Sequence, residues 1–314
     1  MKGNELLDNM ELVDARYIEA ADVLPERKKR RNHIKWFAVA ACFAFVMSMA
    51  ITAEAVNGAV SNLLAPLYGG AQTELVDNVG VPVGASTTVN GYTLTAEAVI
   101  GDKYNIAIVY SLTRADGKCF DEMIYFEDSS NSFMDKNGSG IYRYDLSEDG
   151  TKIQIVEIWS SVDNLFLNRD ANVIFTNLMK SDGEDKILVA EGEWNLRFTL
   201  RYNDTSVNVP VSNMNVQDAV GKRYQIEKIT LSQIGVHVDF TMQKAEAESS
   251  IGDVDFTLSV VLTDDTVIDV SGGFACSIGS DDTAYKGDYG AFFDEPIPME
   301  NIKALIICGS TLEV

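Results

Sequence analysis

Histidine, the side chain best suited to acid–base chemistry near neutral pH, is scarce in this chain, whose 314 residues include only His33 and His237. His237 stands between Val236 and Val238, so in a strand it should lie on the face opposite the two valines and be exposed to solvent. The sequence contains no Gly-x-Ser-x-Gly, no His-Glu-x-x-His and no phosphate-binding glycine loop. Carboxylates are abundant, but nothing singles out a glycosidase-type pair. We therefore predict a non-enzymatic protein with no catalytic residues and no cofactor.

Two acidic segments could attract a cation. Residues 135–140 read Asp-Lys-Asn-Gly-Ser-Gly and place oxygen atoms at alternate positions, as at the start of a calcium loop. An EF-hand has Glu at the twelfth position, where this chain has Leu146, so a polar hairpin connection is favoured. The second segment, interpreted as a solvated loop, contains Asp281, Asp282, Asp288 and Asp294. No metal ligand is assigned in either segment.

The cysteines form no recognisable framework. Cys42 lies in an apolar stretch, and the remaining three, Cys119, Cys276 and Cys308, are an odd number without metal-ligand spacing. Whether Cys276 and Cys308 pair is left open, since buried thiols explain their apolar surroundings equally well.

The element that would position the rest of the chain is a basic cluster followed by an apolar segment. Six Lys and Arg residues lie between Arg27 and Lys35, and residues 36–53 carry no charge. As a helix this segment would span roughly 27 Å, close to the hydrocarbon thickness of a bilayer. We predict a transmembrane helix at 36–54, with the basic side, residues 1–35, in the cytoplasm and the C-terminal body extracellular.

Three alternatives to this anchor fit the sequence less well. A cleaved secretory signal would use Ala53-Glu54-Ala55, but its basic region would be unusually long. A lipobox at Val39–Cys42 would place its cysteine inside the apolar run. A buried core helix does not explain the one-sided basic flank. Single-pass anchoring in the lipid bilayer is therefore the preferred interpretation.

Charge is distributed unevenly along the chain. The net charge is −22, from 25 basic and 47 acidic residues, while residues 1–35 alone carry a net +1. A body this acidic would be repelled by nucleic acid, so no nucleic-acid partner is expected.

The body is predicted to be mostly β. Segments such as Tyr92–Ile100 and Asn105–Thr113 alternate apolar and polar residues, and Asn-Gly or Asp-Gly turns separate such segments. Further strands are expected at 141–146, 151–159, 172–177, 194–202, 206–211, 224–231, 236–242, 256–263, 266–270 and 304–308. Residues 55–86 are expected to form a stalk. The strand pattern that follows favours two tandem antiparallel β-sandwich (Ig-like) domains at 87–211 and 212–314. A faint repeat supports them, since Tyr92-x-Leu94 before Ile106-x-Ile108 resembles Tyr224-x-Ile226 before Val236-x-Val238.

The predicted cytoplasmic segment, residues 1–35, is here called the inner tail. It carries a helical apolar stripe that ends before Pro25. A short helix is marginal alone in water, so its apolar face should bind a partner. The acidic polar face argues for a protein rather than a membrane surface. The predicted partner-binding residues are Leu6, Met10, Val13, Tyr17 and Ala21. A tail that only sets topology is the alternative.

Three stretches resemble a family of single-pass anti-sigma factors of Gram-positive bacteria with an extracytoplasmic domain of unknown function. They are residues 14–21 before the basic run; Ile34-Lys35-Trp36 with Ala40-Ala41-Cys42; and residues 89–94 with 101–104. The resemblance implies that the inner segment binds an extracytoplasmic-function sigma factor and that the outer domains sense or transduce a signal. The tail lacks the His and paired Cys of zinc-binding anti-sigma domains, so such binding would be zinc-free.

A cell-surface binding or structural protein is the second hypothesis, in which the outer β domains act on an unknown extracellular ligand. A cluster of exposed aromatic residues would favour it. The candidates are Trp159, Trp194, Tyr285, Tyr289, Phe292 and Phe293.

Overall fold

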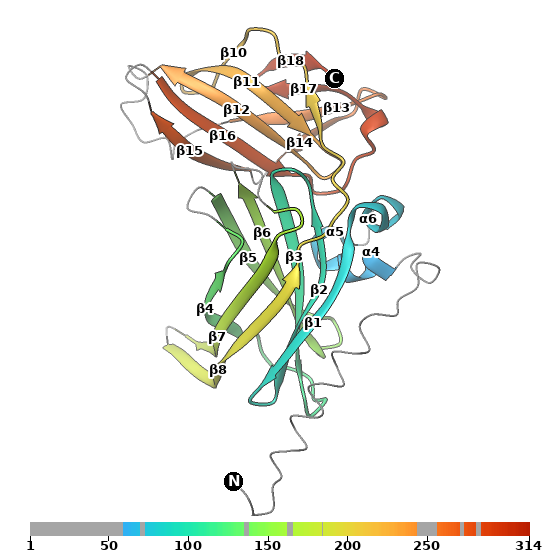
Figure 1. The fold of residues 1–314 in the computed structure, drawn as a ribbon, viewed down its shortest axis with the longest axis vertical. Helices are drawn as coiled ribbons and strands as arrows, with labels where there is room; N and C mark the ends of the chain where they lie inside the picture. The colour runs from blue at the N-terminus through green and yellow to red at the C-terminus, as the bar shows by residue number, and fades with distance from the viewer. Residues whose placement is uncertain are drawn as a thin grey trace, which may run out of the picture. The chain divides into compact units, whose positions relative to one another are not determined.

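The structure is a computed structural model that describes residues 59–69, 73–134, 138–161, 166–183, 185–243, 256–270, 273–280 and 284–314. All of these belong to one compact unit, Ile51–Val314. The described part is mostly β, built from several antiparallel sheets, which confirms the predicted class of secondary structure (Figure 1).

Residues 81–202, here called the first β region, contain two sheets. Sheet A has the strand order β1-β2-β3-β6-β5, and sheet B has the order β4-β7-β8. Sheet A consists of β1 (Val81–Val89), β2 (Tyr92–Gly101), β3 (Asn105–Arg114), β5 (Gly138–Leu146) and β6 (Lys152–Ser161). Sheet B consists of β4 (Tyr125–Asn131), β7 (Asp170–Asp182) and β8 (Asp185–Thr199). Inward-facing residues of both sheets, such as Ile108, Ile155, Phe175 and Trp194, share one hydrophobic core.

Residues 207–314, the second β region, repeat this plan. Sheet C has the order β10-β11-β12-β16-β15 with β9 beside β11, and sheet D has the order β14-β13-β17-β18. Sheet C consists of β9 (Val207–Val209), β10 (Met214–Gln217), β11 (Arg223–Leu231), β12 (Gly235–Gln243), β15 (Phe274–Ser280) and β16 (Ala284–Phe292). Sheet D consists of β13 (Leu258–Leu262), β14 (Val267–Val270), β17 (Ile302–Ile307) and β18 (Ser310–Glu313), with the short helix η4 (Met299–Asn301) before β17. A second hydrophobic core includes Val238, Phe240, Val260 and Leu305.

Sheets A and C place corresponding strands in the same order. The central hairpin β2–β3 has a register shift between Ala96 and Ala98, and its counterpart β11–β12 has one between Ile226 and Lys228. These hairpins contain the two segments of the sequence repeat. Their shared strand order agrees with a duplication, although the boundaries 87–211 and 212–314 stay predictions.

Three short helices lie within the range expected to be a stalk. They are α4 (Ala59–Leu63), α5 (Ala65–Tyr68) and α6 (Thr73–Val79). Val60, Leu64 and Val76 are buried in a cluster with Ile100 and other residues of sheet A. The apolar side chains of these helices therefore cover one face of sheet A. Strand β1 begins at Val81, inside the range expected to be a stalk.

The predicted hairpins are largely present, but six strands were not expected: β1, β4, β10, β15, β16 and β18. The most consequential is β16, which occupies the segment interpreted as an acidic loop and pairs with both β12 and β15. Its glycines and Asp288 have low strand propensity, and their role follows from contacts described below.

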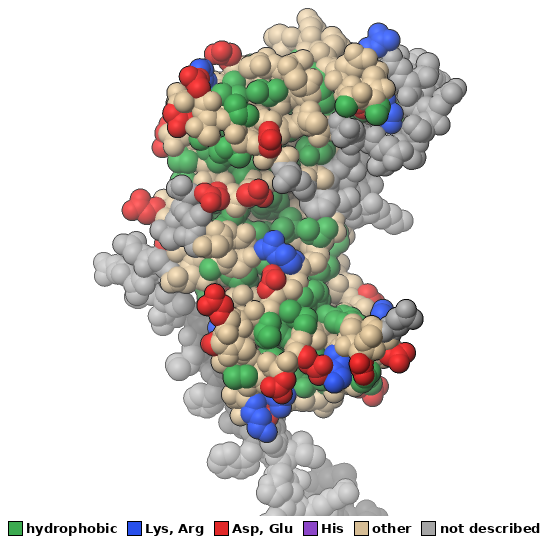
Figure 2. Space-filling view, turned by 180° about the vertical axis from the view of Figure 1, so that it is seen from behind, with side chains coloured by type: hydrophobic (Ala, Val, Ile, Leu, Met, Phe, Trp, Pro, Cys, Tyr) green, Lys and Arg blue, Asp and Glu red, His purple; other side chains and the backbone are tan. Residues whose placement is uncertain are grey.

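No helix among the described residues is both long and apolar enough to cross a bilayer. The predicted transmembrane segment 36–54 lies outside those residues, as does the inner stripe with Leu6, Met10, Val13, Tyr17 and Ala21. Acidic side chains are spread over both β regions on the face seen in Figure 2.

Candidate functional site at the junction of the two β regions

The two β regions meet through equivalent turns. Residues 102–105 connect β2 to β3, and residues 232–235 connect β11 to β12. Asp102 Oδ1 accepts the backbone N–H groups of Tyr104 at 2.9 Å and Asn105 at 2.8 Å. Ser232 Oγ accepts those of Ile234 at 3.2 Å and Gly235 at 3.0 Å. Each turn is therefore fixed by the short polar side chain at its first position.

These two side chains also bond to each other. Ser232 Oγ donates a hydrogen bond to Asp102 Oδ2 at 2.7 Å, and Tyr202 donates its hydroxyl to the Asp102 carbonyl oxygen at 3.0 Å. Asp102 is 3% exposed and Ser232 is 1% exposed. Burial raises the pKa of Asp102, although hydrogen bonds from Ser232, Tyr104 and Asn105 partly offset this effect. The junction thus contains a buried carboxyl group whose bonds come from both regions.

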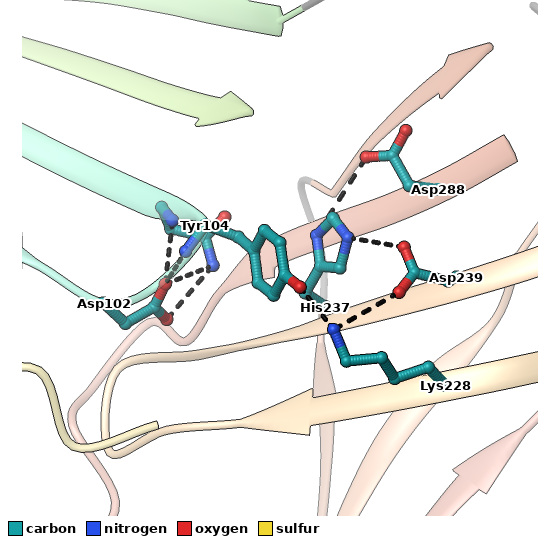
Figure 3. A network of polar contacts seen from close by, with 7 residues as sticks. Asp102, Tyr104, Lys228, His237, Asp239 and Asp288 are labelled. Carbon is teal, nitrogen blue, oxygen red and sulfur yellow. Dashed lines mark hydrogen bonds and ion pairs between the residues drawn. The ribbon is translucent and has the colours of Figure 1, made fainter. Parts of the chain in front are cut away.

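His237 lies beside this pair of turns, and Figure 3 shows its surroundings. Its ring stacks on Tyr104 with centroids 3.8 Å apart and planes 12° apart. Nε2 lies 3.1 Å from Asp239 Oδ1, and Nδ1 lies 4.0 Å from Asp288 Oδ2. Two strands of sheet C, β12 and β16, and one turn of the first β region therefore enclose the imidazole.

Lys228 completes the cluster. Its ammonium group donates to the Tyr104 hydroxyl and lies 3.7 Å from Asp239 Oδ2. Burial acts to raise the pKa of Asp239, but the bond with His237 and the charge of Lys228 outweigh it, so that pKa lies below its ordinary value. Lys228 thereby joins a residue of each β region.

Glycines allow the backbones to approach at this junction. A Cβ at Gly290 would lie 2.1 Å from Ser160 Oγ and 3.1 Å from Asn105 Oδ1. Ile234 and Phe292 of the second β region are buried in the same cluster as Ile100 of the first. The glycine at position 290 of the unexpected strand β16 is thus explained, because a side chain there would overlap residues of the first β region.

This arrangement suits a structural joint better than direct chemistry on a substrate. His237 and Asp288 are each 1% exposed, so a dissolved molecule would reach them only if the regions separated. Among the described residues no group of three or more His, Cys, Asp and Glu side chains is arranged to hold a metal ion. What the junction can do is couple the protonation of Asp102, whose pKa is raised by burial, to the contact between the two regions.

The prediction for His237 was half wrong. It does lie on the face opposite Val236 and Val238, but it is buried because Tyr104 covers it. Asp288 is likewise buried, whereas Asp294 is exposed as expected. Asp135, Asn137, Asp281 and Asp282 lie outside the described residues.

The aromatic candidates form no exposed cluster in the described part of the chain. Those that are buried are Trp194, Tyr289, Phe292 and Phe293, while Trp159 and Tyr285 are half-buried. This removes the feature that would have favoured an aromatic ligand site.

A second buried acid lies inside the first β region. Glu157 on β6 is fully buried and accepts bonds from Tyr142 at 2.5 Å, Trp159 Nε1 at 2.6 Å, Asn131 Nδ2 at 3.2 Å and the Tyr110 hydroxyl. Burial raises its pKa, partly offset by these donors. Its four donors are all protein groups, so Glu157 serves as an internal anchor.

Together these features define a class: a mostly β protein with antiparallel sheets in two regions, joined by a buried polar cluster. No protein-family model matches the chain, and no curated protein matches it. A solved structure that gives a distant structural match is described as "The crystal structure of the conserved domain protein from Bacillus anthracis". It is 18% identical, with a TM-score of 0.49 over 73% of this chain and 76% of that chain. A likeness this distant carries no functional argument.

Proposed function

We propose that this chain is a membrane-anchored signalling regulator of the anti-sigma type. Its tail, residues 1–35, would lie in the cytoplasm and bind a sigma factor of the extracytoplasmic-function class. The binding residues would be Leu6, Met10, Val13, Tyr17 and Ala21. A transmembrane helix at 36–54 would connect it to two tandem β-sandwiches of Ig-like type outside the cell. The observation that carries the proposal is the basic cluster directly before an uncharged segment of bilayer length, followed by a large acidic body.

The junction supports a transducing role for the outer body. A ligand that changed the contact between two β regions could move the first of them, which follows the proposed anchor in sequence. The buried hydrogen bond between Ser232 and Asp102 and the stacking of His237 on Tyr104 would hold one arrangement until it was altered. A joint with two arrangements is the kind of element through which a binding event is transmitted.

The test is an affinity pull-down from membranes with the full chain and with a version lacking residues 1–24. We expect a sigma factor to co-purify with the full chain and to be lost with the truncation. Met10→Asp together with Tyr17→Asp should release the same partner, because two charges would enter the apolar stripe.

Asn4→Asp together with Ala15→Asp is the matched control, since it adds the same charge on the opposite face of the predicted helix. An identical partner list for all samples would contradict the proposal. Function would then lie in the outer regions, as in a cell-surface binding protein.

A further inference from the structure

A cavity opens in the second β region, away from the junction cluster. Its volume is about 390 Å³, within the range of small-ligand sites. Its walls are mainly apolar and come from β13, β14 and the segment between β16 and η4. They include Leu262, Ile268, Val270, Phe293, Ile297 and Pro298. Phe293 and Ile297 also belong to the hydrophobic core, so the cavity reaches from the surface to the core.

The segment that forms one wall is held in place by the backbone. Phe293 N–H donates to Ile234 O at 2.9 Å, and Ile297 N–H donates to Gln233 O at 2.7 Å. Pro296 and Pro298 have no N–H group and cannot extend a strand across the opening. The wall is therefore fixed at a distance from β14 and leaves apolar surface unfilled.

The rim of the cavity is acidic. Asp269, Asp294 and Glu295 line it, and none of the lining residues is Lys or Arg. The Nζ atom of the neighbouring Lys303 lies 2.5 Å from Asp265 Oδ1, so the positive charge of Lys303 is already paired. On the face of the second β region seen in Figure 2, hydrophobic side chains lie between carboxylates. An apolar cavity with such a rim is complementary to a ligand that is apolar at its centre and positive at its edges.

We propose that this cavity binds a cationic peptide segment, in which one bulky apolar side chain enters the cavity and flanking Lys or Arg side chains meet the carboxylates. A bulky apolar side chain is of a size that the volume can accept. The three carboxylates select basic neighbours by attraction, and they reject an acidic peptide by repulsion.

The cavity is also connected to the junction. The wall segment bonds to Gln233 and Ile234, which belong to the same turn as Ser232, and Ser232 bonds to Asp102 of the first β region. A peptide that displaced residues 293–298 would therefore pull on that turn. The role of this site as the signal input of a regulator rests on the function proposed above. The binding of a cationic peptide does not rest on it.

The test is calorimetric titration of the full chain in phosphatidylcholine nanodiscs with acetylated, amidated Lys-Phe-Lys. Lys-Gly-Lys should bind at least about tenfold more weakly, because it lacks the buried ring. Glu-Phe-Glu should not bind. Raising the salt concentration should weaken the binding of Lys-Phe-Lys, since the charges of the peptide remain near solvent.

Asp294→Asn together with Glu295→Gln should weaken binding by about two- to fivefold per carboxylate. Glu300→Gln with Glu313→Gln is the matched control, because it removes two exposed carboxylates outside the lining and should leave binding unchanged. Equal binding of Lys-Phe-Lys and Lys-Gly-Lys would overturn the proposal, as would unchanged binding by Asp294→Asn with Glu295→Gln, or absence of binding at millimolar peptide.

Sedimentation of the same samples tests another occupant. A dimer that dissociates in the Asp294→Asn, Glu295→Gln variant would assign the cavity to a second copy of the chain and overturn the peptide. The pull-down with the inner tail is independent of these results. Peptide binding without a sigma factor would remove only the regulator, and a sigma factor without peptide binding would remove only this site.

Discussion

Ser232 and Asp102 hold equivalent positions in the turns of two corresponding hairpins, and they hydrogen-bond to each other at 2.7 Å across the junction. Each side chain also accepts two backbone N–H groups of its own turn. One short contact therefore fixes both turns and the place where they meet. Removing either side chain should loosen the turn and the junction together.

Ser232→Ala should lower the free energy of unfolding by about 1 to 3 kcal/mol, because it leaves buried polar groups without a partner. Urea unfolding followed by circular dichroism would measure the change. Ser147→Ala is the control, since Ser147 caps an exposed turn by accepting Lys152 N–H at 3.0 Å. It should cost less than about 1 kcal/mol. Equal costs at the two serines would contradict the importance of the junction contact.

Gly290→Ala should destabilise the junction by about 1 to 3 kcal/mol, because its Cβ would overlap a packed neighbour. The added Cβ would lie 2.1 Å from Ser160 Oγ. Thermal unfolding would report the loss as a lower melting temperature. Combining it with Ser160→Gly removes the overlapping atoms and should restore part of the stability. A double variant no better than the sum of the two single variants would show that the clash is not the cause.

The sequence predicted hairpins well where alternation and turn chemistry agree. The hairpin around Asp149-Gly150 forms as β5 and β6, with Gly150 at φ +67°, as an Asp-Gly turn favours. The sequence did not predict β16, because Gly287, Asp288 and Gly290 disfavour a strand locally. Gly290 is required because a Cβ there would meet Ser160 and Asn105, which lie far away in sequence.

His237 shows the same limit for the candidate site. Alternation places it on the correct face of β12, but the ring that buries it belongs to Tyr104 in the other β region. A one-sequence pattern identifies which face a residue occupies and not what covers that face. The repeat between the hairpins was the only signal that pointed to the two turns, and it did not show that they meet.

Stability should depend on pH through Asp102. Burial raises its pKa above the ordinary value of about 3.9, so the folded chain binds this proton more tightly than the unfolded chain. The resulting stabilisation is greatest below pH 4 and is lost as the pH rises through the folded-state pKa. Asp102→Asn keeps an acceptor for the turn and does not titrate. Relative to the wild type, it should therefore gain stability between pH 4 and pH 7.

Urea unfolding of both proteins across that range would measure the difference. Asp239 is a control of opposite sign, because its pKa is lowered and its contribution is lost as the pH falls. Parallel stability curves for wild type and Asp102→Asn would show that the buried carboxyl group has no raised pKa.

Glu157 should tolerate an amide and reject an apolar side chain. In Glu157→Gln, the amide oxygen can accept from Tyr142, Trp159 and Asn131, while the amide nitrogen donates to the Tyr110 hydroxyl, which can rotate. We expect a change within about 1 kcal/mol in the free energy of unfolding. Glu157→Met has a similar volume but accepts none of these bonds, so several buried donors lose their partner at about 1 to 3 kcal/mol each. Urea unfolding followed by tryptophan fluorescence would measure both variants, and equal stability of the two would mean that the carboxylate serves only to fill space.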